Sequence, residues 1–147
     1  MAEKRLELID IHKTFEAGTV NENHVLKGIN LTLETGDFVT VIGGNGAGKS
    51  TLLNSITGTL SPDSGAIIVD GQDVTALSTA KRSKLISHVF QDPKMGTAAR
   101  LTIQENLALA NKRGLKRGLT KGVKADEKVM MRERLATLDL GLEDRLT

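Results

Sequence analysis

The chain has 147 residues, enough for one substantial core, and its 39% hydrophobic and 26% charged residues are a balance typical of a globular protein. It contains no cysteine, which excludes disulfides and thiolate metal sites, and no run of about 18 apolar residues that could span a membrane. The net charge is only +2 and the only aromatic residues are 3 phenylalanines, so a nucleic-acid reader built on stacked aromatic side chains is not expected.

An alternating pattern near the N-terminus predicts the first strand. Within residues 5–11, Leu8 and Asp10 fall on one face of this strand, and Ile11 falls on the other. A polar loop then leads to a second alternating segment, residues 25–33, which predicts a second strand.

A change of pattern follows in the next part of the chain. Residues 38–42 are apolar and mostly β-branched, which is typical of a buried strand in a parallel sheet. The glycine-rich turn 43–48 comes next, and the apolar spacing over 49–56 predicts a helix that Gly58 ends. Turn residues then occupy positions 61–65.

The next segments predict two further strands and a helix between them. Residues 66–69 form an aliphatic run that ends at Asp70-Gly71, a pair typical of a tight hairpin turn. A helix is predicted over 79–85, and a short strand is predicted over 87–90.

The remainder is predicted to be mainly helical, with the change from strands to helices near Met95. Thr102 and Glu105 have the spacing of a capping box, which predicts a helix that begins there and continues through Asn111. A last helix is predicted over 126–138, where apolar residues recur on one face.

Residues 43–50 match the pattern G-x-x-x-x-G-K-[S/T] at every required position. Glycines let backbone N–H groups turn toward phosphate oxygens, because they accept positive φ and carry no Cβ, and the helix N-terminus adds further N–H groups. Lys49 is placed to reach the β- and γ-phosphates, and the Ser50 hydroxyl to ligate Mg²⁺. A chance match is the alternative, against which the flanking apolar run and amphipathic helix argue. The predicted nucleotide-binding residues here are Gly43, Gly44, Asn45, Gly46, Ala47, Gly48, Lys49, Ser50 and Thr51.

Other segments around this loop occur in an order that resembles the ATP-binding subunit of an ABC transporter. They are Val-Leu-Lys-Gly-Ile-Asn-Leu at 25–31, the turn and hairpin at 61–65 and 69–73, Val-Phe-Gln-Asp-Pro at 89–93 and Leu-Thr-Ile-Gln-Glu-Asn-Leu at 101–107. Many ATPases share the phosphate loop, but the ordered series is specific to this family. The resemblance extends nearly from one end of the chain to the other.

The resemblance implies an α/β fold, namely a P-loop NTPase of ABC type. The expected parts are an N-terminal antiparallel β part, a partial parallel-sheet core and a partial helical subdomain. The corresponding division is an incomplete nucleotide-binding core with its β-subdomain over residues 1–94, and a partial helical subdomain over residues 95–147.

The resemblance also implies roles for two residues outside the phosphate loop. Phe15 matches the aromatic residue that stacks on adenine in the family, although a place in the core is the alternative. Gln91 matches the glutamine that approaches Mg²⁺ and the attacking water, although an ordinary surface glutamine is the alternative. The predicted catalytic residues are therefore Lys49 and Gln91, and the predicted metal ligands are Ser50 and Gln91.

Three motifs that the family needs for hydrolysis do not occur in these 147 residues. They are the serine-glycine-glycine signature, a strand that ends in Asp-Glu, and a switch histidine after the helical subdomain; His12, His24 and His88 all come before it. We expect the chain to be the N-terminal part of a larger domain that binds ATP but hydrolyses it poorly. An unpaired apolar sheet edge is also expected to lower stability or to cause self-association.

By resemblance, the function is that of an energy-coupling ATPase subunit, with ATP and Mg²⁺ as its ligands. The implied partners are transmembrane permease subunits, a second nucleotide-binding subunit in a dimer across ATP, and an extracytoplasmic substrate-binding protein; nucleic acid is not an expected partner. The implied location is cytoplasmic, peripheral on the inner face of the membrane. The long loop over 16–23 and the form of the phosphate loop suggest uptake, with an amino acid as cargo.

Two other functions remain open: a soluble ABC-type ATPase that acts on nucleic acid or ribosomes, and a non-catalytic nucleotide-binding fragment. A basic run without acidic residues would help the first of these, the soluble ATPase, to bind nucleic acid. The run consists of Lys112, Arg113, Lys116, Arg117, Lys121 and Lys124. The same run is also consistent with a solvated face or with contact to anionic lipid.

Overall fold

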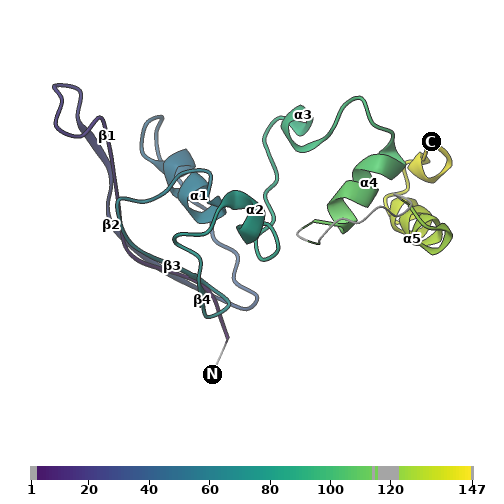
Figure 1. Ribbon diagram of the computed structural model, residues 1–147, viewed down its shortest axis with the longest axis horizontal. Coiled ribbons are helices and arrows are strands. Elements are labelled where there is room, and N and C mark those ends of the chain that lie inside the picture. The colour runs from purple at the N-terminus through teal and green to yellow at the C-terminus, as the bar shows by residue number, and fades with distance from the viewer. Residues whose placement is uncertain (1–2, 114, 116–122, 147) are drawn as a thin grey trace. The chain divides into compact units, whose positions relative to one another are not determined.

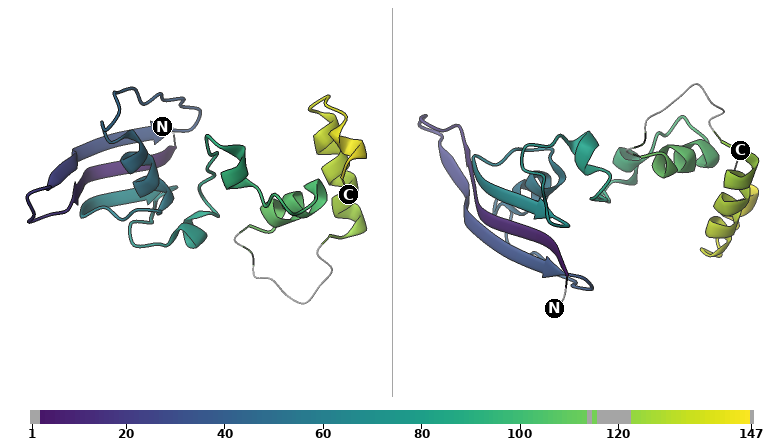
Figure 2. Two further views of the ribbon diagram at one scale, coloured as in Figure 1. Left: turned by 90° about the horizontal axis from the view of Figure 1, so that it is seen from above. Right: turned by 60° about the horizontal axis from the view of Figure 1, so that its bottom comes forward.

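The computed structural model describes residues 3–113, 115 and 123–146. Its internal contacts divide the chain into two compact units, Met1–Ser87 and His88–Thr147, and each has its own hydrophobic cluster. The elements of both units are labelled in Figure 1 and can be followed from two other directions in Figure 2. The subdomain division at 94/95 that the resemblance implies stays a prediction.

The first unit is built on an antiparallel sheet. The strands β1 (Lys4–Phe15), β2 (Asn23–Glu34), β3 (Ser64–Val69) and β4 (Gln72–Asp73) form it in the order β2-β1-β3-β4. These strands confirm those predicted over 5–11, 25–33 and 66–69. The predicted turn between β3 and β4 is confirmed too, because Asp70 and Gly71 both have positive φ, 49° and 75°.

Two helices of the first unit lie on the same side of this sheet, α1 (Lys49–Thr57) and α2 (Thr79–Arg82) (Figure 1). Between α1 and the sheet lies a cluster of buried side chains, Leu8, Ile11, Leu26, Ile67, Val69 and Val74, against which Leu52 and Ile56 of α1 pack. As predicted, α1 ends at Gly58, which adopts the left-handed conformation with φ 81°. α2 is shorter than the helix predicted over 79–85.

A bulge in β1 changes which residues of that strand face the core. The pairing of β1 with β2 shifts register between Leu8 and Ile11, and Asp10 has a positive φ of 50°. As a result, Leu8 and Ile11 are both buried, at 2% and 0% exposure, whereas Ile9 is 48% exposed. The strict alternation predicted over this strand was therefore wrong beyond Leu8, because an extra residue moves Ile11 to the face of Leu8.

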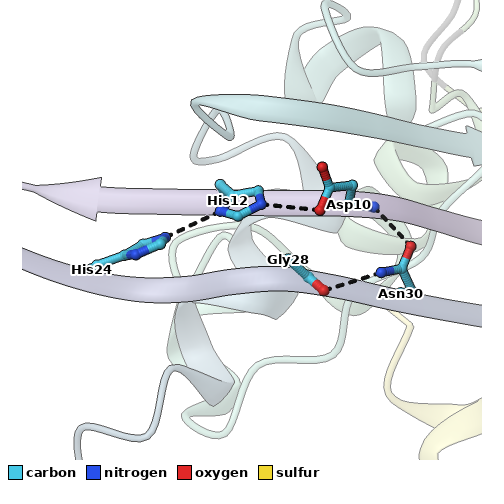
Figure 3. Close-up of polar contacts among 5 residues, drawn as sticks. All are labelled: Asp10, His12, His24, Gly28 and Asn30. Carbon is cyan, nitrogen blue, oxygen red and sulfur yellow. Dashed lines mark hydrogen bonds and ion pairs between the residues drawn. The ribbon is translucent and has the colours of Figure 1, made fainter.

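Polar side chains satisfy the backbone around this bulge (Figure 3). The Asp10 N–H donates to Asn30 Oδ1 at 2.9 Å, and Asn30 Nδ2 donates to the Gly28 carbonyl at 3.1 Å. His12 Nε2 lies 3.0 Å from Asp10 Oδ1, and His12 Nδ1 lies 3.2 Å from His24 Nε2. The row from Asp10 to His24 thus ties the bulged strand to β2 with side-chain contacts as well as ladder bonds.

Two predicted strands, the parallel strand over 38–42 and the short strand over 87–90, are not strands in the described structure. Residues 38–42 and 87–90 form no ladder, and several of their apolar side chains are open to solvent: Phe38 is 93% exposed, Ile42 90% and Val89 91%. The burial predicted for 38–42 was therefore wrong. A parallel strand is stable only between neighbouring strands that satisfy its N–H and C=O groups. The described strands all pair antiparallel with one another, so these segments have no such neighbours.

The second unit is helical, with α3 (Pro93–Gly96), α4 (Ile103–Asn111), α5 (Ala125–Ala136) and the 3₁₀ turn η1 (Leu142–Asp144). Its buried cluster consists of Ala108, Met131, Leu135 and Leu146. These helices confirm the two predicted over 102–111 and 126–138. Within the described part of the chain, no helix has the length and apolar character needed to cross a membrane.

The predicted capping box at the start of α4 is confirmed. The Glu105 N–H donates to Thr102 Oγ1 at 3.3 Å, and the Thr102 N–H donates to Glu105 Oε2 at 2.9 Å. Asn106 fixes the preceding chain as well, because its Oδ1 accepts from the Ala98 N–H at 2.8 Å. Side chains from a few neighbouring residues therefore define this helix start.

Candidate phosphate-binding site

The predicted phosphate loop leads directly into α1. Lys49, Ser50 and Thr51 form the first turn of this helix, and Gly48 is its N-cap residue. Gly46 and Gly48 have positive φ values of 81° and 85°, which a residue with a side chain rarely adopts. The glycines therefore allow the backbone to curl just before the helix begins.

Gly48 also anchors the loop against the sheet. It is the one buried residue between 43 and 50, and a Cβ built on it would lie 2.9 Å from Val25 Cγ1 and 3.3 Å from Leu26 Cδ2. A glycine is thus required here for close approach as well as for φ. By contrast, a Cβ on Gly44 or Gly46 would meet nothing within 4 Å, so that part of the loop faces open space.

Lys49 folds back over the loop that precedes it. Its Nζ donates to the Gly43 carbonyl at 2.6 Å and to the Gly44 carbonyl at 2.7 Å. An ammonium group has three N–H donors, so two bonds to the loop leave one donor for another acceptor. The positive charge is consequently held at the mouth of the glycine loop and remains able to bind an anion.

The start of α1 is electrostatically suited to an anion. The first N–H groups of a helix have no partner within the helix, and together they carry about half a positive charge. At α1 no side chain caps these groups, and no acidic residue lies in the first turn. Ser50 is exposed, which leaves its hydroxyl accessible. The loop and helix start together fit a phosphate-bearing ligand.

The two predicted site residues outside the loop lie in different units. Phe15 is the last residue of β1, 39% exposed, with the Lys13 ammonium 5.9 Å from its ring centre. It is therefore neither a fully buried core residue nor a fully open one. Gln91 is exposed and belongs to the second unit. That Phe15 stacks on adenine and that Gln91 approaches Mg²⁺ stay predictions.

Half of the basic run lies outside the part of the chain that the structure describes. Lys116, Arg117 and Lys121 lie there, so their predicted role has no structural description. Lys124 precedes α5, and its backbone N–H donates to Glu127 Oε2 at 2.8 Å, while Lys112 Nζ lies 3.9 Å from the same carboxylate oxygen.

One residue connected to this site had not been singled out from the sequence. Arg82 is 1% exposed, and its guanidinium binds carbonyls at the C-terminal end of α1, opposite the phosphate loop. Burial lowers the pKa of this guanidinium, and the charge of Asp73 opposes that change. In the sequence, Arg82 is one basic residue among several near a short helix, so no pattern distinguishes it.

Solved structures with the same arrangement are ATP-binding cassettes. A nucleotide-free cassette from an ABC transporter matches 97% of this chain, at 30% identity and a TM-score of 0.72, over 57% of its own length. A dimeric cassette bound to ADP and phosphate, in a post-hydrolysis state, matches 96% of this chain, at 26% identity and a TM-score of 0.73, over 60% of its length. The predicted α/β fold class of ABC type is therefore confirmed.

Sequence relatives agree with this fold. A tyrosine transport ATP-binding protein of Clostridioides difficile (strain R20291) is 40% identical over 74% of this chain and 43% of its own length. A spermidine/putrescine import ATP-binding protein of Hahella chejuensis (strain KCTC 2396) is 37% identical over 92% of this chain and 33% of its own. A macrolide export ATP-binding/permease protein of Chlorobium phaeobacteroides (strain DSM 266 / SMG 266 / 2430) is 34% identical over 96% of this chain and 20% of its own length.

The chain thus spans less than half of each of these three relatives, at most 43%. The sequence profile described as ABC transporter matches residues 26–146, which include the phosphate loop, α1, α4 and α5. On these grounds the chain belongs to the ABC transporter family, among its ATP-binding subunits.

Proposed function

We propose that this chain binds ATP at the loop 43–48 and the first turn of α1, and that it does so as part of an energy-coupling transport subunit. The observation that carries the proposal is the position of the Lys49 ammonium, which bonds to two loop carbonyls beside an uncapped helix start. Backbone N–H groups and one flexible cation supply the donors that a polyphosphate needs.

The contribution of each residue follows from its chemistry. The N–H groups of the loop and of Lys49, Ser50 and Thr51 bind phosphate oxygens, and the third donor of Lys49 binds the terminal phosphates. Phe15, at the end of β1, supplies a partly exposed ring on which adenine stacks. Because hydrogen bonds to charged groups contribute roughly 1.5–3 kcal/mol each, several of them give affinities in the micromolar to millimolar range.

Mg²⁺ is proposed to accompany the nucleotide. In the described part of the chain, no group of three or more His, Asp, Glu or Cys side chains is arranged to hold a metal. Mg²⁺ commonly keeps several waters and binds through one or two protein ligands together with substrate phosphates. Ser50, and Gln91 from the second unit, are the proposed protein ligands, so metal binding depends on the nucleotide.

Hydrolysis by this chain alone is proposed to be poor. Lys49 and Gln91 can position phosphate and water, but these 147 residues contain no strand ending in Asp-Glu that would hold the metal and polarise the water, and no signature segment. The dimeric relative bound to ADP and phosphate supports the proposal that a second subunit is needed across the nucleotide.

The proposed physiological partners are membrane permease subunits, on which the subunit lies peripherally at the cytoplasmic side. Relatives with transport names support this assignment, and they include both an import and an export protein. We propose uptake, with an amino acid as cargo and a separate substrate-binding protein, on the basis of the tyrosine transport relative and the polyamine import relative.

Calorimetric titration of ATP, with and without Mg²⁺, tests the binding site directly. Lys49→Ala should weaken ATP binding about tenfold or more, since it removes a charge-assisted hydrogen bond to phosphate. Lys27→Ala is the matched control, because Lys27 is an exposed lysine on β2, and its affinity for ATP should stay within about twofold of wild type. Equal ATP affinities for Lys49→Ala and the wild type would contradict the proposed site.

A further inference from the structure

Arg82 is a fully buried cation that donates four hydrogen bonds to backbone carbonyls. Its Nη1 donates to the Ser55 and Ile56 carbonyls at 2.6 and 2.8 Å. Its Nη2 donates to the Thr75 carbonyl at 2.8 Å, and its Nε to the Leu77 carbonyl at 2.9 Å. An arginine stays protonated even when buried, so a positive charge is held at the point where these carbonyls meet.

Two of the four carbonyls belong to the last turn of α1. The final carbonyls of a helix have no N–H partner within the helix, and they carry the negative end of its dipole. Gly58 makes room for the guanidinium, because a Cβ at that position would lie 2.8 Å from Arg82 Nε. Arg82 therefore acts as a C-terminal cap for α1, although it is distant from this helix in the sequence.

The other two carbonyls connect α1 to the sheet. Thr75 and Leu77 follow β4, and the Ile67 N–H of β3 donates to Thr75 Oγ1 at 2.8 Å. The planar fork of one guanidinium thus joins the C-terminal end of α1 to the chain that returns from the β3–β4 hairpin. At the opposite end of α1, the close approach of Gly48 to Val25 fixes the helix against β2.

We propose that Arg82 is a positioning residue for the phosphate loop, because it fixes the direction in which the N-terminal N–H groups of α1 point. This inference rests on the proposed function of that loop. α1 has nine residues and is therefore a rigid rod of about 13 Å. A tilt about the Gly48 contact, once the far end is released, turns the N–H groups of the first turn away from the phosphates.

Substitutions at Arg82 separate positioning from stability. Arg82→Lys keeps the charge but loses the planar fork, and Arg82→Met loses both. At temperatures where each protein is folded, Arg82→Met should weaken ATP binding about tenfold, with Arg82→Lys in between, because misplaced donors lose binding steeply. In the nucleotide-free protein, the backbone amide resonances of Gly48 and Ser50 should shift in both variants. If Arg82→Met does not fold, Gly58→Ala, which pushes the guanidinium aside without removing it, takes its place beside Arg82→Lys.

Val69→Ala is the control for a loss of stability alone. Val69 is a buried residue of β3, 6% exposed, and its truncation should lower the melting temperature but leave ATP affinity within about twofold of wild type. Arg82 variants that lose stability but keep the ATP affinity and the Gly48 and Ser50 resonances of wild type would overturn the inference. If the wild-type chain binds no ATP, the phosphate-site proposal fails, while the amide resonances still decide whether Arg82 positions the helix.

Discussion

The helix α1 and residues 38–42 belong to the same predicted phosphate-binding motif, yet they differ in how completely they are packed. α1 has Leu52 and Ile56 against the core cluster, and its last carbonyls bind Arg82. Of residues 38–42, which come only a few positions earlier, Phe38 is 93% and Ile42 90% exposed. Residues 38–42 are the more apolar of the two segments in sequence and yet the more exposed, so apolar composition does not explain the difference.

The difference comes from where each segment finds its partners. A helix satisfies its own backbone, and α1 needs only one apolar face against a sheet that the same unit supplies. A parallel strand must pair on its edges with strands that are distant in the sequence. The antiparallel strands β1 and β2 avoid this requirement because they follow one another in the chain. The apolar, β-branched pattern of 38–42 therefore predicts a strand for which the described part of the chain offers no partner.

The largest expected effect comes from an isoleucine-to-alanine substitution in the packed sheet, compared with the same substitution in the exposed segment 38–42. Ile67→Ala removes a side chain that is 0% exposed in β3, and should lower the free energy of unfolding by about 3 kcal/mol. Ile42→Ala removes one that is 90% exposed, and should change it by less than about 0.5 kcal/mol. Urea unfolding monitored by circular dichroism measures the free energy of unfolding of both variants.

The same pair of variants also tests whether residues 38–42 are covered by association between molecules. If self-association buries Ile42 in solution, Ile42→Ala should destabilise the protein and light scattering should report a smaller particle than for wild type. Equal losses of stability in both variants would show that Ile42 is as buried as Ile67, and would remove the contrast between the two segments.

The next effect concerns two glycines of the phosphate loop. Gly48→Ala should destabilise the protein by about 2 kcal/mol, because the new Cβ would lie 2.9 Å from Val25 Cγ1 and the residue has a φ of 85°. Gly44→Ala should have little effect on stability, since its Cβ would meet nothing within 4 Å. Thermal melting of the two variants checks this ranking. A similar melting temperature for both would mean that the start of α1 is not pressed against β2.

Elements that depend on near neighbours in the chain were predictable from the sequence. The turn at Asp70-Gly71, the stop at Gly58 and the capping box at Thr102 all appear where short patterns placed them. The bulge in β1 could not be predicted in this way. At the bulge, the Asp10 N–H donates a hydrogen bond to Asn30 Oδ1 of the neighbouring strand, and no local sequence pattern predicts that contact.

The candidate site shows the same division between local and distant information. The loop 43–48 and Lys49 are contiguous, so a single pattern identified them, and the structure joins them through Lys49 and the Gly43 carbonyl. Arg82 supports the same helix from 26 and 27 positions further along the chain, through contacts with Ile56 and Ser55. Its partners are backbone carbonyls, which any residue could provide, so the sequence carries no sign of them.

A smaller effect contrasts the starts of two helices. The first N–H groups of α4 are capped by a side chain, whereas those of α1 have no such cap and are proposed to bind phosphate. Thr102→Ala should therefore cost about 1 kcal/mol in the absence of any ligand, whereas Thr102→Ser, which keeps the hydroxyl, should stay close to wild type. Hydrogen exchange at the Glu105 and Asn106 amides measures the loss locally. Unchanged exchange in Thr102→Ala would show that packing alone holds the helix start.

The smallest effect concerns Asp63, which makes a polar contact with Lys13, a residue 50 positions earlier in the sequence. Its carboxylate accepts from Lys13 Nζ at 2.6 Å and from the Thr14 N–H at 2.6 Å. The Lys13 hydrogen bond, followed by that of Thr14, holds the pKa of Asp63 below its ordinary value of 3.8. Because the folded protein binds this proton more weakly than the unfolded one, the contact stabilises the fold above pH 3.8 and loses that effect as pH falls through the lowered pKa.

Asp63→Asn should accordingly be less stable than wild type near pH 7 by less than about 1 kcal/mol, since the carboxylate is 43% exposed and solvent screens its charge. The difference between the two proteins should shrink as pH falls below 3.8, where the wild-type carboxylate also becomes neutral. Urea unfolding at a series of pH values measures it. A difference that stays constant down to acid pH would mean that the shape of the Asp63 side chain, and not its charge, joins β1 to the turn before β3.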